Sequence, residues 1–235
     1  MPDLIVALDV PSSAEARAVV DQLGDTVSFY KVGLELFIAD GEATLAMLRE
    51  RGKRVFLDLK LHDIPRTVER AVASAARFGV ELLTIHACGA RAMVAAAAQA
   101  ATAAPHPPKI LAVTVLTSLD DADLADIGVA RDAAAQVDAL GRLAVESGAD
   151  GLVCSPREVG RLRAALGPRP YLVTPGIRPA GGDLGDQKRV ATPAAAARDG
   201  ASAIVVGRPI VEAPDPRAAA LAILAELAEA RSPAP

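Results

Sequence analysis

Short apolar segments alternate with alanine-rich amphipathic segments eight times along the 235-residue chain. Apolar runs of about four to eight residues are typical of buried strands, and a period near 3.6 residues is typical of helices that cover a sheet. The expected strands cover residues 4–9, 29–33, 54–60, 82–86, 110–115, 151–154, 171–174 and 203–207. The expected helices cover residues 13–23, 41–51, 67–78, 90–101, 133–147, 156–166, 193–198 and 216–230. This alternation predicts an α/β fold with a parallel sheet.

Eight β/α units in a chain of this length indicate a (β/α)8 barrel (TIM barrel), a fold that typically needs ~250 residues. The alternative is an open doubly wound sheet, which binds its ligand in one crevice where the strand order reverses. Polar residues follow nearly every expected strand, and this distribution favours a ring of loops around a barrel mouth. The polar strand-end residues are Asp9, Lys31, Lys60, His86, Thr117, Arg178 and Arg208. No Gly/Ser-rich linker interrupts the chain, so we expect residues 1–235 to form a single domain.

Composition excludes several classes of function. A net charge of −4 and a pI near 5.4 provide no broad basic field for phosphates, so we expect no nucleic-acid partner. The sequence contains no long apolar run and no signal-peptide pattern, so we expect no membrane association and a cytoplasmic location. Cys88 and Cys154 lack metal-ligand spacing, and we expect them to remain reduced.

The third expected strand ends in charged residues. Side chains alternate faces along a strand, so Asp58 and Lys60 share one face, roughly 6.5 Å apart along the chain. Burial of such a pair costs several kcal/mol per ion, so stability alone seldom calls for it. Lys31 follows the second strand, and together with Asp58, Lys60 and Asp63 it makes a charged array that predicts a catalytic centre. The alternatives are a strand-end lysine that extends to water and an Asp63 that caps the next helix.

The segments after the last two expected strands carry the features of a phosphate site. Barrel enzymes often bind phosphate there through backbone amides. Arg178, Gln187 and Arg208 supply donors, and Gly207 permits close backbone approach. The first of these loops has the freedom to fold over a ligand because it contains Gly176, Gly181, Gly182 and Gly185. The alternative is a solvated loop with ordinary surface arginines.

Other polar residues carry weaker signals. Asp9 follows the first strand, where it could accept hydrogen bonds from sugar hydroxyls or cap the following turn. His62, His86 and His106 receive no catalytic role, because a lone strand-end or loop histidine is more often structural or solvated. No cluster has the spacing of a transition-metal site, so no metal is expected.

The sequence resembles the orotidine 5′-monophosphate decarboxylase family along its whole length. The stretch from Asp58 to Thr67, Asp-Leu-Lys-Leu-His-Asp-Ile-Pro-Arg-Thr, is similar to the family signature Asp-x-Lys-x-x-Asp-Ile-Pro-x-Thr without a departure. Further similar segments follow in the family's order: Leu8-Asp-Val, Tyr30-Lys-Val-Gly, Val115-Leu-Thr-Ser, Thr174-Pro-Gly-Ile-Arg-Pro and Val206-Gly-Arg-Pro. The short loops resemble the compact bacterial branch of the family.

The resemblance implies decarboxylation of orotidine 5′-monophosphate to uridine 5′-monophosphate and carbon dioxide, without a cofactor, in the last step of de novo pyrimidine nucleotide synthesis. It implies that Lys60 donates the proton to C6, that Asp58 lies against the departing carboxylate, and that Lys31 reaches the sugar. It also implies a homodimer in which Asp63 and Thr67 reach the neighbouring site. The remaining implied contacts are Asp9 to ribose, Thr117 to the pyrimidine, and Arg178, Gln187, Gly207 and Arg208 to phosphate.

Two rival functions remain open at this point. A magnesium-dependent sugar-phosphate decarboxylase or aldolase of the same barrel superfamily also resembles the Asp-x-Lys-x-x-Asp pattern, although the Asp63-Ile-Pro-Arg-Thr continuation favours the nucleotide decarboxylase. A non-catalytic module that binds nucleotide phosphates is the second rival.

Overall fold

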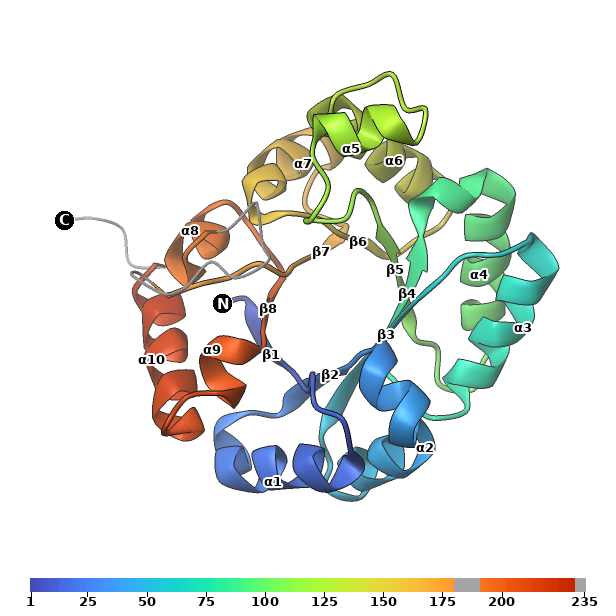
Figure 1. Ribbon diagram of the computed structural model, residues 1–235. Coiled ribbons are helices and arrows are strands. Elements are labelled where there is room, and N and C mark those ends of the chain that lie inside the picture. The colour runs from blue at the N-terminus through green and yellow to red at the C-terminus, as the bar shows by residue number, and fades with distance from the viewer. Residues whose placement is uncertain (180–190, 231–235) are drawn as a thin grey trace.

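Eight parallel strands close into a barrel in the order of the chain (Figure 1). The computed structural model describes residues 1–179 and 191–230. Each strand pairs with its sequence neighbours, and β1 pairs with β8 to complete the ring. The strands are β1 (Asp3–Ala7), β2 (Phe29–Val32), β3 (Arg54–Leu61), β4 (Leu82–His86), β5 (Lys109–Val113), β6 (Gly151–Val153), β7 (Tyr171–Thr174) and β8 (Ala203–Val206). The predicted single-domain (β/α)8 barrel is therefore confirmed.

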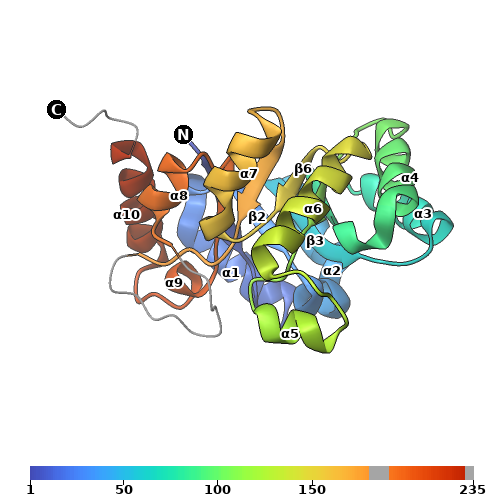
Figure 2. The same cartoon turned by 90° about the horizontal axis from the view of Figure 1, so that it is seen from above.

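Helices surround the barrel (Figure 1). They are α1 (Ser13–Leu23), α2 (Leu34–Glu50), α3 (Pro65–Ala76), α4 (Ala90–Thr102), α5 (Asp121–Asp126), α6 (Ala133–Glu146), α7 (Val159–Leu166), α8 (Pro193–Arg198), α9 (Arg208–Val211) and α10 (Pro216–Glu229). Three short 3₁₀ turns cover Gly24–Thr26, Ala87–Gly89 and Pro156–Glu158. Figure 2 shows the two short helices α5 and α9 at the end of the barrel opposite the N-terminus, beyond the carboxyl ends of the strands.

One predicted helix begins in the wrong place. Helix α2 starts at Leu34 rather than at residue 41, and its backbone bends at Asp40, which has non-helical angles (φ −146°, ψ 37°). The Asp40 carboxylate accepts hydrogen bonds from the Ser13 backbone N–H and hydroxyl, both at 3.0 Å, and these contacts stabilise the bend. The side chains of Leu34 and Ile38 are apolar but exposed, so the residues before the bend lack an amphipathic pattern. For this reason the first turns of α2 were not predicted. The short helices α5 and α9 were not predicted.

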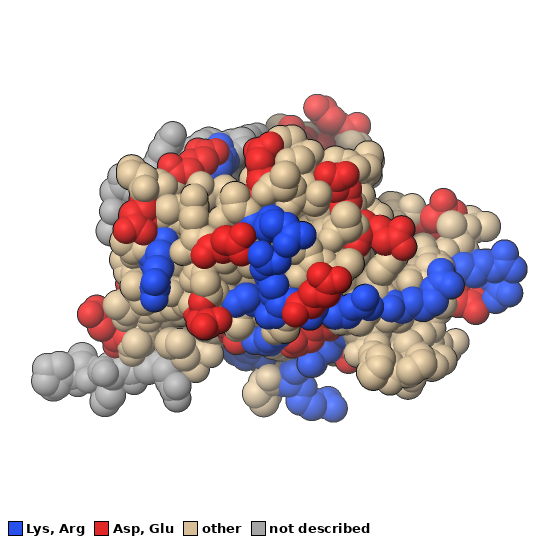
Figure 3. Space-filling model, turned by 90° about the horizontal axis from the view of Figure 1, so that it is seen from below, with Lys and Arg blue, Asp and Glu red and all other residues tan. Residues whose placement is uncertain are grey.

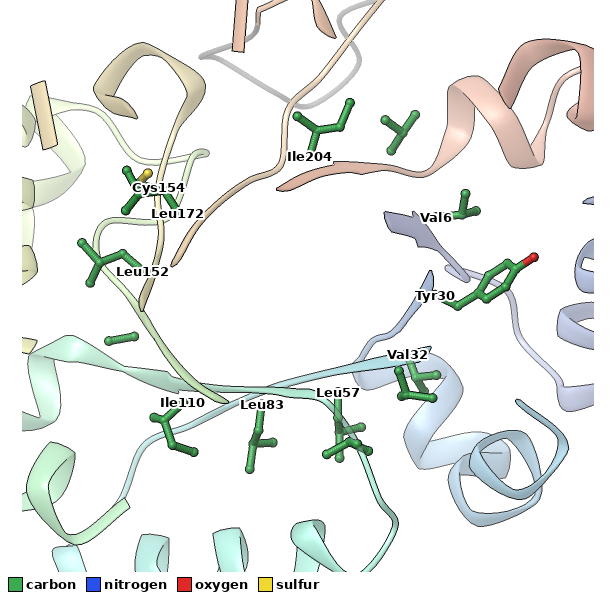
Figure 4. Close-up of a cluster of buried hydrophobic side chains, with 14 of the residues drawn as sticks. Val6, Tyr30, Val32, Leu57, Leu83, Ile110, Leu152, Cys154, Leu172 and Ile204 are labelled. Atoms are coloured by element: carbon green, nitrogen blue, oxygen red, sulfur yellow. The ribbon is translucent and has the colours of Figure 1, made fainter. Parts of the chain in front are cut away.

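The alternation of side chains along the strands divides the core into two parts. One part fills the barrel interior and includes Ile5, Phe29, Phe56, Leu82 and Leu111. The other part lies between the strands and the helices (Figure 4), where side chains such as those labelled Tyr30, Leu83 and Ile204 point away from the barrel axis. Each strand therefore contributes to both parts, with a period of two residues.

A polar network joins the amino-terminal ends of the strands at the barrel floor. Arg54 donates to Glu81 through Nε and Nη2, both at 2.7 Å, and to Asp3 at 3.2 and 3.0 Å. The Tyr171 hydroxyl donates to Asp3 at 2.8 Å, and the Arg54 guanidinium lies 4.0 Å above the Phe29 ring centroid. Burial alone would raise the pKa of Asp3, but the hydrogen bonds from Arg54 and Tyr171 and the Arg54 charge lower it overall. The network thus connects β1, β3, β7 and the residue before β4.

Charged side chains of both signs are interspersed on the face of the molecule that carries α1 and α2 (Figure 3). Within residues 1–179 and 191–230, every helix is too short or too polar to span a membrane.

Candidate active site

A cavity of about 430 Å³ lies at the carboxyl ends of the strands. The active sites of TIM-barrel enzymes occur at this end of the barrel. Apolar side chains from the barrel interior, such as Phe56, Val113 and Val205, form part of its wall. Eight of the predicted site residues line it: Asp9, Lys31, Asp58, Lys60, Thr117, Arg178, Gly207 and Arg208.

Four of these residues form a continuous chain of alternating charge. Lys31 Nζ lies 2.9 Å from Asp9 Oδ1 and 3.8 Å from Asp58 Oδ2. Lys60 Nζ lies 2.8 Å from the same Asp58 oxygen. The Asp58 side chain is 10% exposed and the Lys31 side chain 12% exposed, whereas Asp9 is open to solvent at 57%. The buried carboxylate therefore lies between two ammonium groups, which balance its charge.

Strand geometry explains why these charges gather. Ala7, Phe29 and Phe56 point into the barrel interior, and the charged residues lie two positions further along the chain. Asp9, Lys31 and Asp58 accordingly form the next layer toward the carboxyl end. Lys60, which alternation predicts on the same face as Asp58, lines this cavity with them.

The backbone of β3 departs from regular pairing at this layer. Leu57 pairs with Leu83 and Leu61 with Ile85, so the residues between them bulge against the single residue Thr84. Lys60 lies in this bulge. Its backbone φ of 51° is in the left-handed region, which residues other than glycine rarely adopt. Its side chain still lines the cavity. The predicted strand 54–60 is therefore present within β3, but a bulge interrupts its pairing with β4 near its end.

Thr84 is a contact residue that the sequence analysis missed. Its hydroxyl donates to Asp58 Oδ1 at 2.9 Å and accepts from the Lys60 backbone N–H at 2.8 Å. Thr84 follows the inward-facing Leu82 by two positions, so it belongs to the same polar layer. The signal available in the sequence was a polar residue at an inward-facing position of a buried strand. The sequence analysis considered only the strand-end residue His86 on this strand.

Two glycines lie against the charged chain. A Cβ at Gly33 would stand 2.9 Å from Lys31 Nζ and 3.4 Å from Asp9 Oδ1. A Cβ at Gly207 would stand 3.4 Å from Asp9 Oδ2. The first position leaves no room for a side chain without movement of the lysine.

Residues that follow β7 and β8 also line the cavity. They are Gly176, Arg178, Gly207 and Arg208, and Arg208 begins the short helix α9. Glu212, one helical turn beyond Arg208, also lines the cavity and was not predicted. The predicted phosphate ligand Gln187 lies outside the described residues, as do Gly181, Gly182 and Gly185 of the same predicted loop.

Asp63 and Thr67 are exposed and do not line the cavity of this chain. Asp63 accepts a hydrogen bond from the Ile64 backbone N–H at 2.6 Å, immediately before α3 begins at Pro65. Ile64 is the N-cap of α3 and no described side chain caps this helix, so the alternative interpretation of Asp63 as a helix cap was wrong. The contact with Ile64 uses one carboxylate oxygen of Asp63.

A histidine pair lies near the charged chain. The rings of His62 and His86 are 5.6 Å apart, and Cys88 Sγ is 3.9 Å from His62 Nε2. Burial lowers the pKa of His86, and the nearby His62 and Lys60 lower it further. The charge of Asp58 acts in the opposite direction and raises the pKa, but the net shift is downward. Among the described residues, no three or more His, Cys, Asp or Glu side chains are arranged to hold a metal ion.

Comparison with known proteins identifies the family. The model of the orotidine 5′-phosphate decarboxylase / HUMPS family matches residues 2–223. The chain belongs to this family. The recognition from the Asp58–Thr67 signature is thus confirmed, and so is the prediction that the protein is an enzyme of the orotidine 5′-phosphate decarboxylase family.

Individual members of the orotidine 5′-phosphate decarboxylase family are similar over nearly their full length. A decarboxylase of that name from Rhodopseudomonas palustris strain HaA2 is 54% identical over 228 residues, which cover 97% of this chain and 95% of the relative. One from Moorella thermoacetica is 53% identical over 230 residues, covering 95% and 91%. The crystal structure of orotidine 5′-phosphate decarboxylase from Lactobacillus acidophilus superimposes with a TM-score of 0.87 at 42% identity, covering 97% of this chain and 99% of that one.

Proposed function

We propose that this protein decarboxylates orotidine 5′-monophosphate to uridine 5′-monophosphate without a cofactor, in pyrimidine biosynthesis, and that Lys60 is the proton donor. The observation that carries the proposal is the chain Asp9–Lys31–Asp58–Lys60, which lines the same cavity as Arg178 and Arg208. The names of the related proteins support the same substrate.

The proposed reaction needs a cation beside the reacting carbon. The bond from C6 to the carboxylate breaks and releases carbon dioxide, and the electron pair remains on C6. The Lys60 ammonium stabilises this developing charge and then transfers a proton to C6, which forms the new C–H bond. Lys60 recovers its proton from solvent. The ion pair with Asp58 at 2.8 Å holds the Lys60 ammonium in place at the cavity before the reaction.

Asp58 has a second proposed role. In the proposed complex its carboxylate lies close to the carboxylate that leaves, and like charges in a cavity repel each other. The two lysines that contact Asp58 reduce this repulsion. We therefore assign the larger part of the catalytic effect to Lys60 and to the fixed charges around it.

The substrate phosphate supplies binding energy far from the reacting carbon. Enzymes lower barriers by ~8–23 kcal/mol, and one lysine cannot provide a reduction toward the upper end of that range. We propose that Arg178, Gln187, Gly207 and Arg208 hold the phosphate, and that this binding energy orients the pyrimidine against Lys60. Asp9 and Lys31 would bind the ribose.

The proposal includes a homodimer. Asp63 and Thr67 are exposed beside the charged strand end, and Ile64 between them is 68% exposed. We propose that a second copy of the chain covers this segment and receives Asp63 and Thr67 at its own site. Within each site, Thr117 would contact the pyrimidine. Size-exclusion chromatography with light scattering checks the dimer.

A cytoplasmic location, which cell fractionation checks, is compatible with two free cysteines.

The decisive experiment follows the absorbance of orotidine 5′-monophosphate with purified protein and excess chelator. We expect full turnover, and we expect Lys60→Ala to abolish it while binding of uridine 5′-monophosphate stays measurable by calorimetry. Activity that is lost in chelator and restored by Mg²⁺ would favour the metal-dependent rival. Binding without any turnover would favour the non-catalytic module.

A further inference from the structure

We propose that Thr84 is a positioning residue for the reaction, which holds the Lys60 backbone and the Asp58 carboxylate in one fixed arrangement. The proposal rests on the decarboxylase function proposed above and adds a residue to its machinery. Thr84 does not line the cavity, so it acts through its two neighbours rather than on substrate.

One buried hydroxyl contacts both charged residues. A hydroxyl can donate one hydrogen bond and accept others, and here it donates to Asp58 Oδ1 at 2.9 Å and accepts from the Lys60 N–H at 2.8 Å. Thr84 is fully buried and Asp58 is 7% exposed, so water does not compete strongly for either bond. The branched side chain of threonine further restricts the direction of the hydroxyl.

The bond to Lys60 explains how its backbone is retained. Left-handed geometry at a residue with a side chain is unfavourable and persists only where surrounding contacts enforce it. In the bulge of β3, Thr84 is the single residue of β4 between the paired positions 83 and 85. Its hydroxyl binds the backbone N–H of the residue with a φ of 51°. The direction in which the Lys60 ammonium enters the cavity therefore depends on this contact.

The bond to Asp58 fixes which oxygen faces the lysines. With Oδ1 held by Thr84, Oδ2 lies 2.8 Å from Lys60 Nζ and 3.8 Å from Lys31 Nζ. Without the hydroxyl, the carboxylate is free to rotate and to bring Oδ1 toward Lys31. A valine at this position would also leave Oδ1 and the Lys60 N–H without their partner, which is costly in a buried place.

The test compares Thr84→Val, which keeps the shape and removes the hydroxyl, with Thr84→Ser, which keeps the hydroxyl. We expect Thr84→Val to lower kcat about 10- to 100-fold, as for the loss of hydrogen bonds to charged groups. KM should change less than about threefold, because the proposed phosphate ligands Arg178 and Arg208 are untouched. Thr84→Ser should restore kcat to within about threefold of the wild type. Thr44→Val is the matched control: Thr44 is equally buried, but its hydroxyl donates to the Asp40 carbonyl within α2, and kcat should not change.

An unchanged kcat in folded Thr84→Val, a loss confined to KM, or a Thr84→Ser variant as slow as Thr84→Val would overturn the inference. If Thr84→Val does not fold, Thr84→Ala takes its place, and a kcat equal to that of Thr84→Ser would overturn it as well. A wild-type protein without turnover would instead refute the proposed function, and this inference with it.

Discussion

Substitution of Gly33 by alanine should separate activity from stability. Gly33 has extended backbone angles (φ −94°, ψ −175°) that alanine adopts without strain. The added Cβ, however, would stand 2.9 Å from Lys31 Nζ. Favourable contacts between such atoms need about 3.5 Å or more, so the ammonium must retreat by roughly 0.6 Å. Lys31 links Asp9 to Asp58, and its movement would disturb both contacts.

The expected magnitudes differ for the two properties. A displacement of about 1 Å in a catalytic arrangement can cost about 100-fold, so we expect kcat/KM to fall about 10- to 100-fold. Alanine stabilises by about 0.4–1 kcal/mol through the unfolded chain. It is poorer than glycine by a similar amount as the residue before a helix, and Gly33 precedes α2. The midpoint of thermal unfolding should therefore stay within about 4 °C of the wild type.

Steady-state decarboxylation and differential scanning calorimetry measure the two effects. Gly160→Ala is the matched control. Gly160 lies in α7, and an added Cβ would stand 3.9 Å from Asp199, which is an ordinary van der Waals contact. We expect this control to keep full activity and to gain stability. A Gly33→Ala variant with wild-type kcat/KM would refute the argument that the position of the Lys31 ammonium matters. Extensive destabilisation would show that the lysine is not the part that moves.

Three further results are expected. Arg208→Ala should raise KM about 10- to 100-fold in decarboxylation assays, because a cationic donor to phosphate is lost, and an unchanged kcat/KM would remove Arg208 from the site. Inactive Asp63→Ala and Lys60→Ala chains, mixed and shown to form heterodimers, should recover up to about a quarter of wild-type activity if Asp63 serves the partner; no recovery would contradict a shared site. Asp3→Asn should flatten the pH dependence of the free energy of unfolding in denaturant titrations. The lowered pKa of Asp3 gives stability that is present above its ordinary pKa near 3.8 and lost as pH falls through the folded value. Its half-exposed ion pair limits the effect at neutral pH to about 1 kcal/mol, and an equally steep acid loss in Asp3→Asn would contradict this role.

The barrel was predictable because its strands are buried on both faces. Continuous apolar runs such as 110–113 and 203–206 have no other stable position than between the barrel interior and a layer of helices. The charged residues Asp9, Lys31 and Asp58 could be located because a period of two residues carries each strand from its apolar interior to its polar end. Local sequence was sufficient for both steps.

Features that depend on contacts between distant segments were not predictable. The bend of α2 at Asp40 requires Ser13, which lies on another helix. The left-handed backbone at Lys60 arises where β3 bulges against β4, and a period of two residues contains no signal for a bulge. Thr84 was missed for the same reason, since its importance comes from the two residues that it reaches across the sheet.

The network of Arg54, Asp3, Glu81 and Tyr171 has a consequence for the evolution of the fold. It closes the barrel at the end away from the cavity and ties together strands that are far apart in the sequence. Substitutions in the loops of the mouth can therefore accumulate without loosening this floor. A lineage, or an engineer, can vary the ligand that enters from one side while contacts on the opposite side keep β1, β3, β7 and the start of β4 connected.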